Sequence, residues 1–500
     1  MRRRHPLSLR AVSLALAGAA LLLGGCGKAE TDALDVAVIG AGPLSLGDAL
    51  APPDSLAQAV LRLNIAQGLV RFDANGQIEP GLAERWTVSD DGLSYIFRLA
   101  AGEWPDGRRI MARDVARILK RQVRSPRGSP TRDALGAVED VVAMTDRVIE
   151  IRLATPRPNL LELLAQPDLA LVREGVGSGP FRLRPNDTEE RPAPDGLLRL
   201  TRRPRGIDGE PGEREEINLW VLAAAPAIAA FVKGELDLVL GGTMVDLPLA
   251  RRSKLPRGAL RFDPANGLFG LVPARAGGPL AEPDVRRLLS QAIDRPALVA
   301  ALGVPGLGPR ATVLQSGLEG MADPLQPQWL AQAAIERRAA LQQEAQRLFG
   351  EAGPPRIRVA LPEGPGGNLL FARLAADWGA IGIGVDRAAA GTAPDLRWLD
   401  AVAPSASPGW YLRQFRCGAA PICNPQIDGI LDAARTAPDP TQRGALFADA
   451  AFMIDDLSLF IALAAPVRWS LVGDRATGYQ DNRFARHPLA DIVRRPTRGF

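Results

Sequence analysis

Histidine is almost absent from this chain, with 2 residues among 500, His5 and His487. Many zinc sites, and Ser–His or Cys–His catalysis, depend on imidazole groups. We therefore expect no histidine-based metal site and no hydrolase of these types. Phosphate-binding loops are missing as well, because the glycines of residues 175–180 lack the required spacing and are interpreted as turn glycines. The sequence predicts a protein that has no cofactor and no metal and is not an enzyme.

The chain also lacks a charge excess outside its first residues. Its formal net charge is +4. Four arginines, Arg2, Arg3, Arg4 and Arg10, account for that value, and no acid precedes Glu30. The remaining chain is balanced, without the surplus of basic groups that binds a phosphate backbone. We therefore expect no nucleic-acid partner.

Long apolar segments are limited to one stretch near the start of the chain. Residues 11–23 are apolar, but they are too few to span a hydrocarbon core of ~30 Å. A basic region precedes them and the residues LGGC follow, ending at Cys26. This arrangement is typical of a signal peptide and resembles the lipobox of bacterial lipoproteins. We expect a signal peptide over residues 1–25, a lipid on Cys26, a tether over 26–34 and a membrane-anchored lipoprotein of the periplasm or cell envelope. The alternative is an ordinary signal peptide with an incidental cysteine.

Cysteine is scarce, with 3 residues in the chain. If Cys26 carries a lipid, Cys417 and Cys423 are the two thiols left. Export implies an oxidising compartment, and the loop between them contains Gly418 and Pro421. A short-range disulfide is expected, with two free thiols as the alternative.

Strand and helix patterns alternate along the whole chain, which predicts an α/β or α+β class. Residues 86–99 read as a hairpin around the turn at Asp90, Asp91 and Gly92. Strands are expected at residues 35–40, 69–72, 147–153, 181–183, 216–222, 236–240, 357–361 and 460–463. Helices are expected at residues 55–65, 112–124, 159–164, 225–234, 283–292, 330–349, 368–379, 427–434 and 441–455.

Acidic residues occur in two adjacent pairs. Asp90 and Asp91 flank the hairpin turn, and Asp455 and Asp456 end a helix. Both pairs are interpreted as solvated acids rather than as a catalytic dyad. Asp294 is expected to serve as a helix cap or ion-pair partner.

One acid stands beside aromatic residues. Asp400 follows Trp398 at the end of an apolar run, and Trp410 and Tyr411 come shortly after. A single carboxylate next to aromatic rings suits an ammonium group in a partly dry pocket. The alternative is a surface aspartate near a core tryptophan.

Several motifs resemble the peptide/nickel-type (family 5) solute-binding proteins of ABC importers, the dipeptide- and oligopeptide-binding group. The most specific are QGLVRFD at 67–73, PGLAERWTVSDDGLSYIFRL at 80–99, WPDG at 104–107 and ARDV at 112–115. Further matches are GSGPF at 177–181, KGELD at 233–237, DVRRLLSQAID at 284–294, ADWGAIGI at 376–383 and residues 424–434.

The resemblance implies a fold of the periplasmic binding protein type II kind. Two α/β lobes are joined by hinge strands, and a subdomain is inserted in the first lobe. The implied first lobe comprises residues 35–53, 173–262 and 468–500. The implied inserted subdomain covers residues 54–172, and the second lobe covers 263–467.

The resemblance also implies a function and a site. Such proteins hold a short peptide or related solute between the lobes and deliver it to an ABC permease and ATPase complex. In dipeptide-binding relatives a Trp and a nearby Asp meet the peptide ammonium, and Trp398 and Asp400 stand at the matching place. Some relatives bind the ligand carboxylate with an arginine at the start of the 368–379 helix. This chain has no arginine at that place, and Arg373, one turn further on, is the candidate. The expected ligand contacts are Asp400, Trp398, Trp410, Tyr411 and Arg373.

Other functions remain open at this point. The solute could be an opine, a haem or a metal chelate instead of a peptide. A lipid-anchored chaperone or sensor without transport is a further alternative. A monomer is expected in each case.

Overall fold

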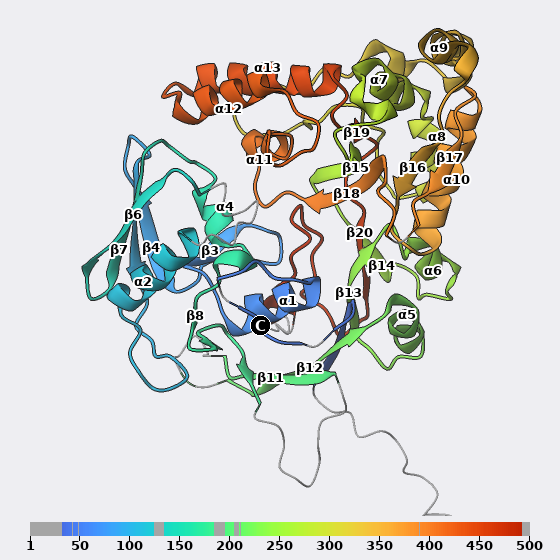
Figure 1. Ribbon diagram of the computed structural model, residues 1–500. Coiled ribbons are helices and arrows are strands. Elements are labelled where there is room, and N and C mark those ends of the chain that lie inside the picture. Colours follow the sequence, from blue (N-terminus) through green and yellow to red (C-terminus); the bar gives the residue numbers. More distant parts are fainter. Residues whose placement is uncertain are drawn as a thin grey trace, which may run out of the picture. The chain divides into compact units, whose positions relative to one another are not determined.

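The computed structural model (Figure 1) describes residues 33–42, 44–48, 50–124, 135–184, 196–204, 210, 212–389 and 391–492. The chain divides into two units, Met1–Ala33 and Leu34–Phe500. All helices and strands of the described residues belong to the second unit. The predicted signal peptide, the lipid site at Cys26 and nearly all of the tether lie outside the described residues.

A seven-stranded sheet is the first of two large sheets. Its central strand β1 (Leu34–Ile39) pairs in parallel with β12 and β13, and the outer pairs are antiparallel. Val36, Ala37 and Val38 are fully buried, as expected for a continuous apolar run covered on both faces. The order is β10 (Arg182–Leu183), β11 (Leu197–Arg202), β12 (Glu215–Leu222), β1, β13 (Leu238–Thr243), β20 (Arg468–Val472) and β14 (Leu260–Asp263).

A five-stranded sheet is the second. All residues of its strand β15 (Gly267–Pro273) are buried, and β15 pairs antiparallel with β18 and β19. The other edge is parallel, because β16 pairs with both β17 and β18 in that sense. The order is β17 (Val385–Arg387), β16 (Ile357–Ala360), β18 (Leu396–Val402), β15 and β19 (Ile461–Ala462).

Two short crossovers join these sheets. Residues 264–266 connect β14 to β15, and residues 463–467 connect β19 back to β20. One hydrophobic cluster contains Val239 and Leu471 of the first sheet together with Leu271 and Ile357 of the second. The crossovers stand where the resemblance implies hinge strands, and a short double connection of this kind is suited to hinge closure.

A smaller antiparallel sheet is inserted between β1 and β12 along the chain (Figure 1). Its order is β4 (Ala83–Val88), β5 (Ser94–Leu99), β7 (Val148–Leu153) and β6 (Val138–Thr145). The predicted hairpin at residues 86–99 is confirmed as β4 and β5. The sheet has a core of its own with α2 (Ala112–Val123), in which Phe97, Trp104 and Leu119 are buried. Nearby elements are β2 (Val70–Phe72), β3 (Ile78–Pro80), α4 (Leu160–Leu164), β8 (Val172–Arg173) and β9 (Val176–Gly177).

Helices cover the two large sheets, and most begin at a recognisable signal. Ser55 caps α1 by accepting from the Gln58 amide, and Asp294 caps α8 by accepting from Ala297. Proline occupies the first turn of α7, α12 and α13. These helices are α1 (Leu56–Ile65), α5 (Ala224–Val232), α6 (Leu247–Arg252), α7 (Pro283–Ala292), α8 (Arg295–Leu302), α9 (Ala334–Phe349), α10 (Pro365–Gly379), α11 (Pro408–Arg413), α12 (Pro425–Thr436), α13 (Pro440–Asp456) and α14 (Leu489–Ile492).

The turn glycines of residues 175–180 have a packing role that the sequence did not reveal. A Cβ at Gly177 would lie 2.2 Å from the Ile65 carbonyl oxygen, and one at Gly179 would lie 2.6 Å from that of Asn64. The absence of side chains lets this segment approach the end of α1. Within the described part of the chain, no helix has the length and apolar character needed to cross a membrane.

The predicted disulfide between Cys417 and Cys423 is present, with 5.1 Å between their Cα atoms. It closes the turn after α11. Such a short loop adds about 2 kcal/mol at most by the loop-entropy argument, so its main effect is to fix the path of the chain between α11 and α12.

The interpretation of Asp455 and Asp456 as a solvated pair is right for Asp456 and wrong for Asp455. Asp456 is exposed. The carboxylate of Asp455 turns inward and accepts from the Val313 amide over 2.8 Å. Burial raises the pKa of Asp455 to about 7, although the Val313 hydrogen bond acts in the opposite direction.

Asp455→Asn is expected to stabilise the protein in a pH-dependent way. Because the folded-state pKa of Asp455 is raised, its contribution opposes folding above pH 7 and disappears as the pH falls toward 4. The variant should gain on the order of 2–4 kcal/mol of unfolding free energy at pH 8 and almost nothing at pH 4. Urea denaturation across that range measures the difference from wild type. Asp456→Asn is the control, and equal, pH-independent effects of both changes would contradict the assignment.

Gly366→Ala is expected to destabilise the fold where α10 meets the end of β13. The Gly366 amide donates to the Val245 carbonyl over 2.8 Å, and a Cβ would lie 1.9 Å from the Met244 carbonyl oxygen. The overlap should lower the unfolding free energy by about 1–3 kcal/mol. Gly379→Ala, at the far end of the same helix with nothing within 4 Å, should instead raise it by up to about 1 kcal/mol. Losses of equal size at both positions would contradict this account of the contact.

Candidate functional site

The loop between β18 and α11, residues 403–407, contacts the segment around α4, which packs with the smaller sheet. The Asn159 side chain donates to the Ser405 hydroxyl over 2.8 Å, and the Gln166 side chain donates to the Pro404 carbonyl over 2.8 Å. The Ala406 amide donates to Glu162 over 3.0 Å. Asn159, Gln166 and Ser405 are all buried. These polar contacts join two parts of the chain that are connected covalently only through the first sheet and its crossovers.

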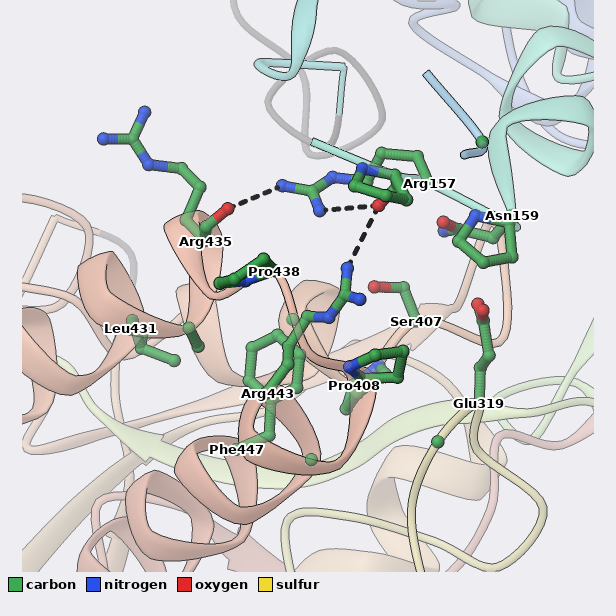
Figure 2. Close-up of a pocket in the computed structure, with 18 of the residues that line it drawn as sticks. Arg157, Asn159, Glu319, Ser407, Pro408, Leu431, Arg435, Pro438, Arg443 and Phe447 are labelled. Carbon is green, nitrogen blue, oxygen red and sulfur yellow. Dashed lines mark hydrogen bonds between the residues drawn. The ribbon is translucent and has the colours of Figure 1, made fainter. Parts of the chain in front are cut away.

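A pocket of about 430 Å³ opens beside this contact (Figure 2), and we call it the arginine pocket. The turn between β4 and β5 and residues 156–159 form one side. The other side is formed by residues 319–320, the loop before α11, and the facing ends of α12 and α13. The volume falls within the range of small-molecule sites, and both sides of the contact contribute to it.

Arginine side chains dominate the electrostatics of the arginine pocket. Burial lowers the pKa of Arg157 to about 10, and the positive charges of neighbouring arginines act in the same direction. These neighbours, in order of effect, are Arg413, Arg443 and Arg435. Arg157 donates to the Pro156 carbonyl over 3.1 Å, and Arg443 donates to the same oxygen over 3.0 Å (Figure 2). Two guanidinium groups therefore converge on one neutral acceptor.

Glu319 supplies negative charge to the arginine pocket (Figure 2). Partial loss of contact with water raises the pKa of Glu319, and the charge of Glu162 raises it further. Arg443 and Arg157 act in the opposite direction. Arg416 also lines the pocket, but it is held by Asp432 in two hydrogen bonds of 2.9 and 3.0 Å. Among the described residues, neither Arg157 nor Arg443 forms an ion pair with a carboxylate, although the charge of Glu319 acts on both.

Asp400, predicted to meet a solute ammonium, pairs with Arg468 at the start of β20. The two carboxylate oxygens lie 2.9 and 3.1 Å from the guanidinium nitrogens, and the side chains are 11% and 16% exposed. Trp398 lies on the same strand and packs edge-on against Phe269, with ring centroids 4.6 Å apart. The structure thus brings Trp398 and Asp400 to one strand near a crossover, with the charge of Asp400 already balanced.

The other predicted contacts lie apart from this pair. Trp410 and Tyr411 are buried residues of α11, and burial raises the pKa of Tyr411. The Tyr411 hydroxyl has no hydrogen-bond partner among the described residues. Arg373 is exposed on α10. Their roles in ligand binding remain predictions.

Sequence reasoning missed Arg157, Glu319, Ser407 and Arg443, which the structure gathers around the arginine pocket. Arginine is abundant throughout this chain, so no local pattern marks these positions. The sequence predicted no metal site, on the ground that histidine is scarce. In the described ranges, no cluster of three or more His, Cys, Asp or Glu side chains is suited to a metal.

Comparisons with known proteins agree on one family. The sequence model of the bacterial extracellular solute-binding proteins, family 5 (middle), matches residues 77–393. The Pseudomonas aeruginosa protein named "Probable di/tripeptide-binding protein 5" is 24% identical over 493 residues, covering 85% of this chain and 89% of its own.

Solved structures agree on the fold. Haemophilus influenzae OppA in complex with RPPGFSPFR superposes with a TM-score of 0.76 at 17% identity, covering 92% of this chain and 99% of its own. The Escherichia coli murein tripeptide binding protein MppA gives 0.75 at 18% identity, covering 91% and 97%. The two-lobed α/β fold of the type II periplasmic binding proteins is thereby confirmed, while the lobe boundaries by residue number remain predictions.

The pair of Asp400 and Arg468 is expected to show strong energetic coupling. Breaking a buried pair leaves one charge without a partner, so Asp400→Asn or Arg468→Gln should each cost about 3–5 kcal/mol of unfolding free energy. The double variant should cost clearly less than the sum, which a double-mutant cycle by urea denaturation measures. The matched control is the exposed pair of Arg347 and Glu344, whose coupling should stay below about 1 kcal/mol. Additive losses at Asp400 and Arg468 would contradict the pairing.

Proposed function

The chain belongs to the bacterial extracellular solute-binding proteins of family 5, and we propose that it captures a short peptide or peptide-like solute and delivers it to an ABC importer. The observation that carries the proposal is a pocket with walls on both sides of a contact between separately packed parts of the chain. A solute seated there touches both parts at once.

Closure is the physical basis of the proposed function. A solute that binds the closed arrangement better than the open one shifts the population toward closure by that difference in affinity. The direct contacts of Asn159 with Ser405 and of Gln166 with Pro404 supply part of the closing free energy without solute. The permease and ATPase then recognise the closed form. In this scheme the solute leaves chemically unchanged, and the protein is not an enzyme.

A peptide is the solute class that the relatives favour. The Pseudomonas aeruginosa relative is named for di- and tripeptides. Asp400 remains the proposed partner of a peptide ammonium, together with Trp398, Trp410 and Tyr411, and Arg373 that of a carboxylate. Because Arg468 holds Asp400, an ammonium would have to share or displace this arginine.

The finer features of location and organisation belong to the same proposal. We propose cleavage after residue 25, acylation of Cys26, a tether to residue 34 and anchoring in the cell envelope. The first lobe would comprise residues 35–53, 173–262 and 468–500, with the inserted subdomain at 54–172 and the second lobe at 263–467.

Peptide binding is expected to stabilise the purified protein without peptide turnover. A peptide at about 100 times its dissociation constant should raise the unfolding free energy by ~2.7 kcal/mol. Thermal unfolding in the presence of defined di- to tetrapeptide mixtures detects the gain, and mass spectrometry of the mixtures before and after incubation should show identical composition. Mass spectrometry of solute co-purified with the protein identifies the class independently. If a non-peptide solute co-purifies and no peptide raises the unfolding temperature, the proposed solute class is wrong. If the peptides are cleaved, the proposed role as a binding protein is wrong.

A further inference from the structure

We propose that the arginine pocket binds a carboxylate of the solute, held between the guanidinium groups of Arg157 and Arg443. This inference rests on the proposed function and narrows it to solutes that carry an anionic group. It assigns a site away from Asp400 and Arg373, the two charged contacts expected from the sequence.

The hydrogen-bonding capacity of the two arginines supports this assignment. Each guanidinium has five N–H donors in a planar fork. Arg157 and Arg443 both donate to the single carbonyl oxygen of Pro156, and Arg157 also reaches the Arg435 carbonyl at 3.5 Å. Neutral carbonyl groups leave most of these donors unused. The charge of Glu319 acts on both arginines, but neither arginine forms an ion pair with a carboxylate among the described residues. A carboxylate accepts two parallel bonds from one guanidinium and can bridge to a second, which is the geometry for which arginine is suited.

The apolar lining of the arginine pocket strengthens the attraction of the two guanidinium groups for an anion. Apolar side chains of Pro408, Leu431, Pro438 and Phe447 line the same pocket. Reduced contact with water strengthens the attraction between a carboxylate and a guanidinium. The mutual repulsion of the arginines, which contributes to the lowered pKa of Arg157, would be relieved by the bound anion.

The positions of the two arginines connect the site to closure. Arg157 lies just before α4, on the side of the smaller sheet, whereas Arg443 lies in the first turns of α13 on the other side (Figure 2). A carboxylate bound by both would therefore bridge the contact. Opening would separate the two guanidinium groups, so the anion contributes most in the closed state. Glu319 on the pocket wall opposes the anion and limits its affinity.

Calorimetry with matched peptides tests the site on the full mature protein. Three tripeptide mixtures are compared: one with free C-terminal carboxylates, the same mixture amidated, and an amidated mixture with one glutamate residue. The free mixture, the glutamate mixture, or both should bind about tenfold or more tightly than the neutral amidated one, since hydrogen bonds to charged groups have this strength. The mixture that retains the advantage identifies the carboxylate source, the peptide terminus or an acidic side chain.

Three variants and a control complete the test. Arg157→Gln and Arg443→Gln should each lower the affinity for the anionic mixture relative to that for the neutral mixture about ten- to a hundredfold. Glu319→Gln should raise anionic affinity about threefold or more, because it removes an opposing charge without changing the shape of the side chain. Arg117→Gln on α2, whose side chain is 67% exposed, should change neither affinity.

The outcomes separate the two proposals. Equal binding of anionic and neutral mixtures, with no effect of Arg443→Gln or Glu319→Gln, would overturn the carboxylate site while the peptide-binding function stands. Failure of all three mixtures to bind would instead reject the peptide function and the carboxylate site with it. An arginine variant that fails to fold gives no information on the site. Glu319→Gln still tests the site in that case, because the carboxylate site predicts that this variant binds the anionic mixture more tightly.

Discussion

The two short crossovers between the large sheets are the constraint on which the rest of the molecule depends. Residues 264–266 and 463–467 connect adjacent strands of the two sheets, and short double connections of this kind are where hinge closure of two lobes takes place. Buried residues from both sheets share one core cluster around this double connection. The ion pair of Asp400 and Arg468 lies beside it. The closing surfaces lie away from the crossovers. A solute that binds both surfaces at once therefore favours the closed state.

The chemistry of the closing surfaces follows from this constraint. Neutral hydrogen bonds, such as that between Asn159 and Ser405, can form and break without leaving a bare charge behind. The guanidinium groups of Arg157 and Arg443 instead meet across the arginine pocket and share one carbonyl. Closure without an anion gathers like charges, and closure with an anion neutralises them. An anionic solute would therefore favour the closed conformation over the open one.

The sequence was most informative where local patterns decide structure. The apolar run of β1, the hairpin of β4 and β5, and α7 with proline in its first turn were all predictable, because strand periodicity, turn residues and helix caps act within a few positions. The motifs between residues 67 and 115 predicted the family. The disulfide was also predictable, because the two cysteines lie 6 positions apart in a chain whose leader predicts export to an oxidising compartment.

Long-range partners were not predictable in the same way. Asp400 meets Arg468 across 68 positions, and Arg443 reaches Pro156 across 287. Neither contact leaves a mark on the local sequence. Asp455 was misjudged because the end of α13 packs against the Val313 amide from a distant loop. Burial set by tertiary packing thus decides which acids and arginines are available to a solute.

The most direct test of the account measures the distance between the two closing parts of the protein. Fluorescent probes at the exposed positions Met144 in β6 and Phe452 in α13 report it by energy transfer in single molecules. The account predicts a broad or longer distance distribution without solute and a single shorter one when the co-purified solute is restored. A distribution that stays unchanged with the restored solute would contradict the claim that this protein works by closing around its ligand.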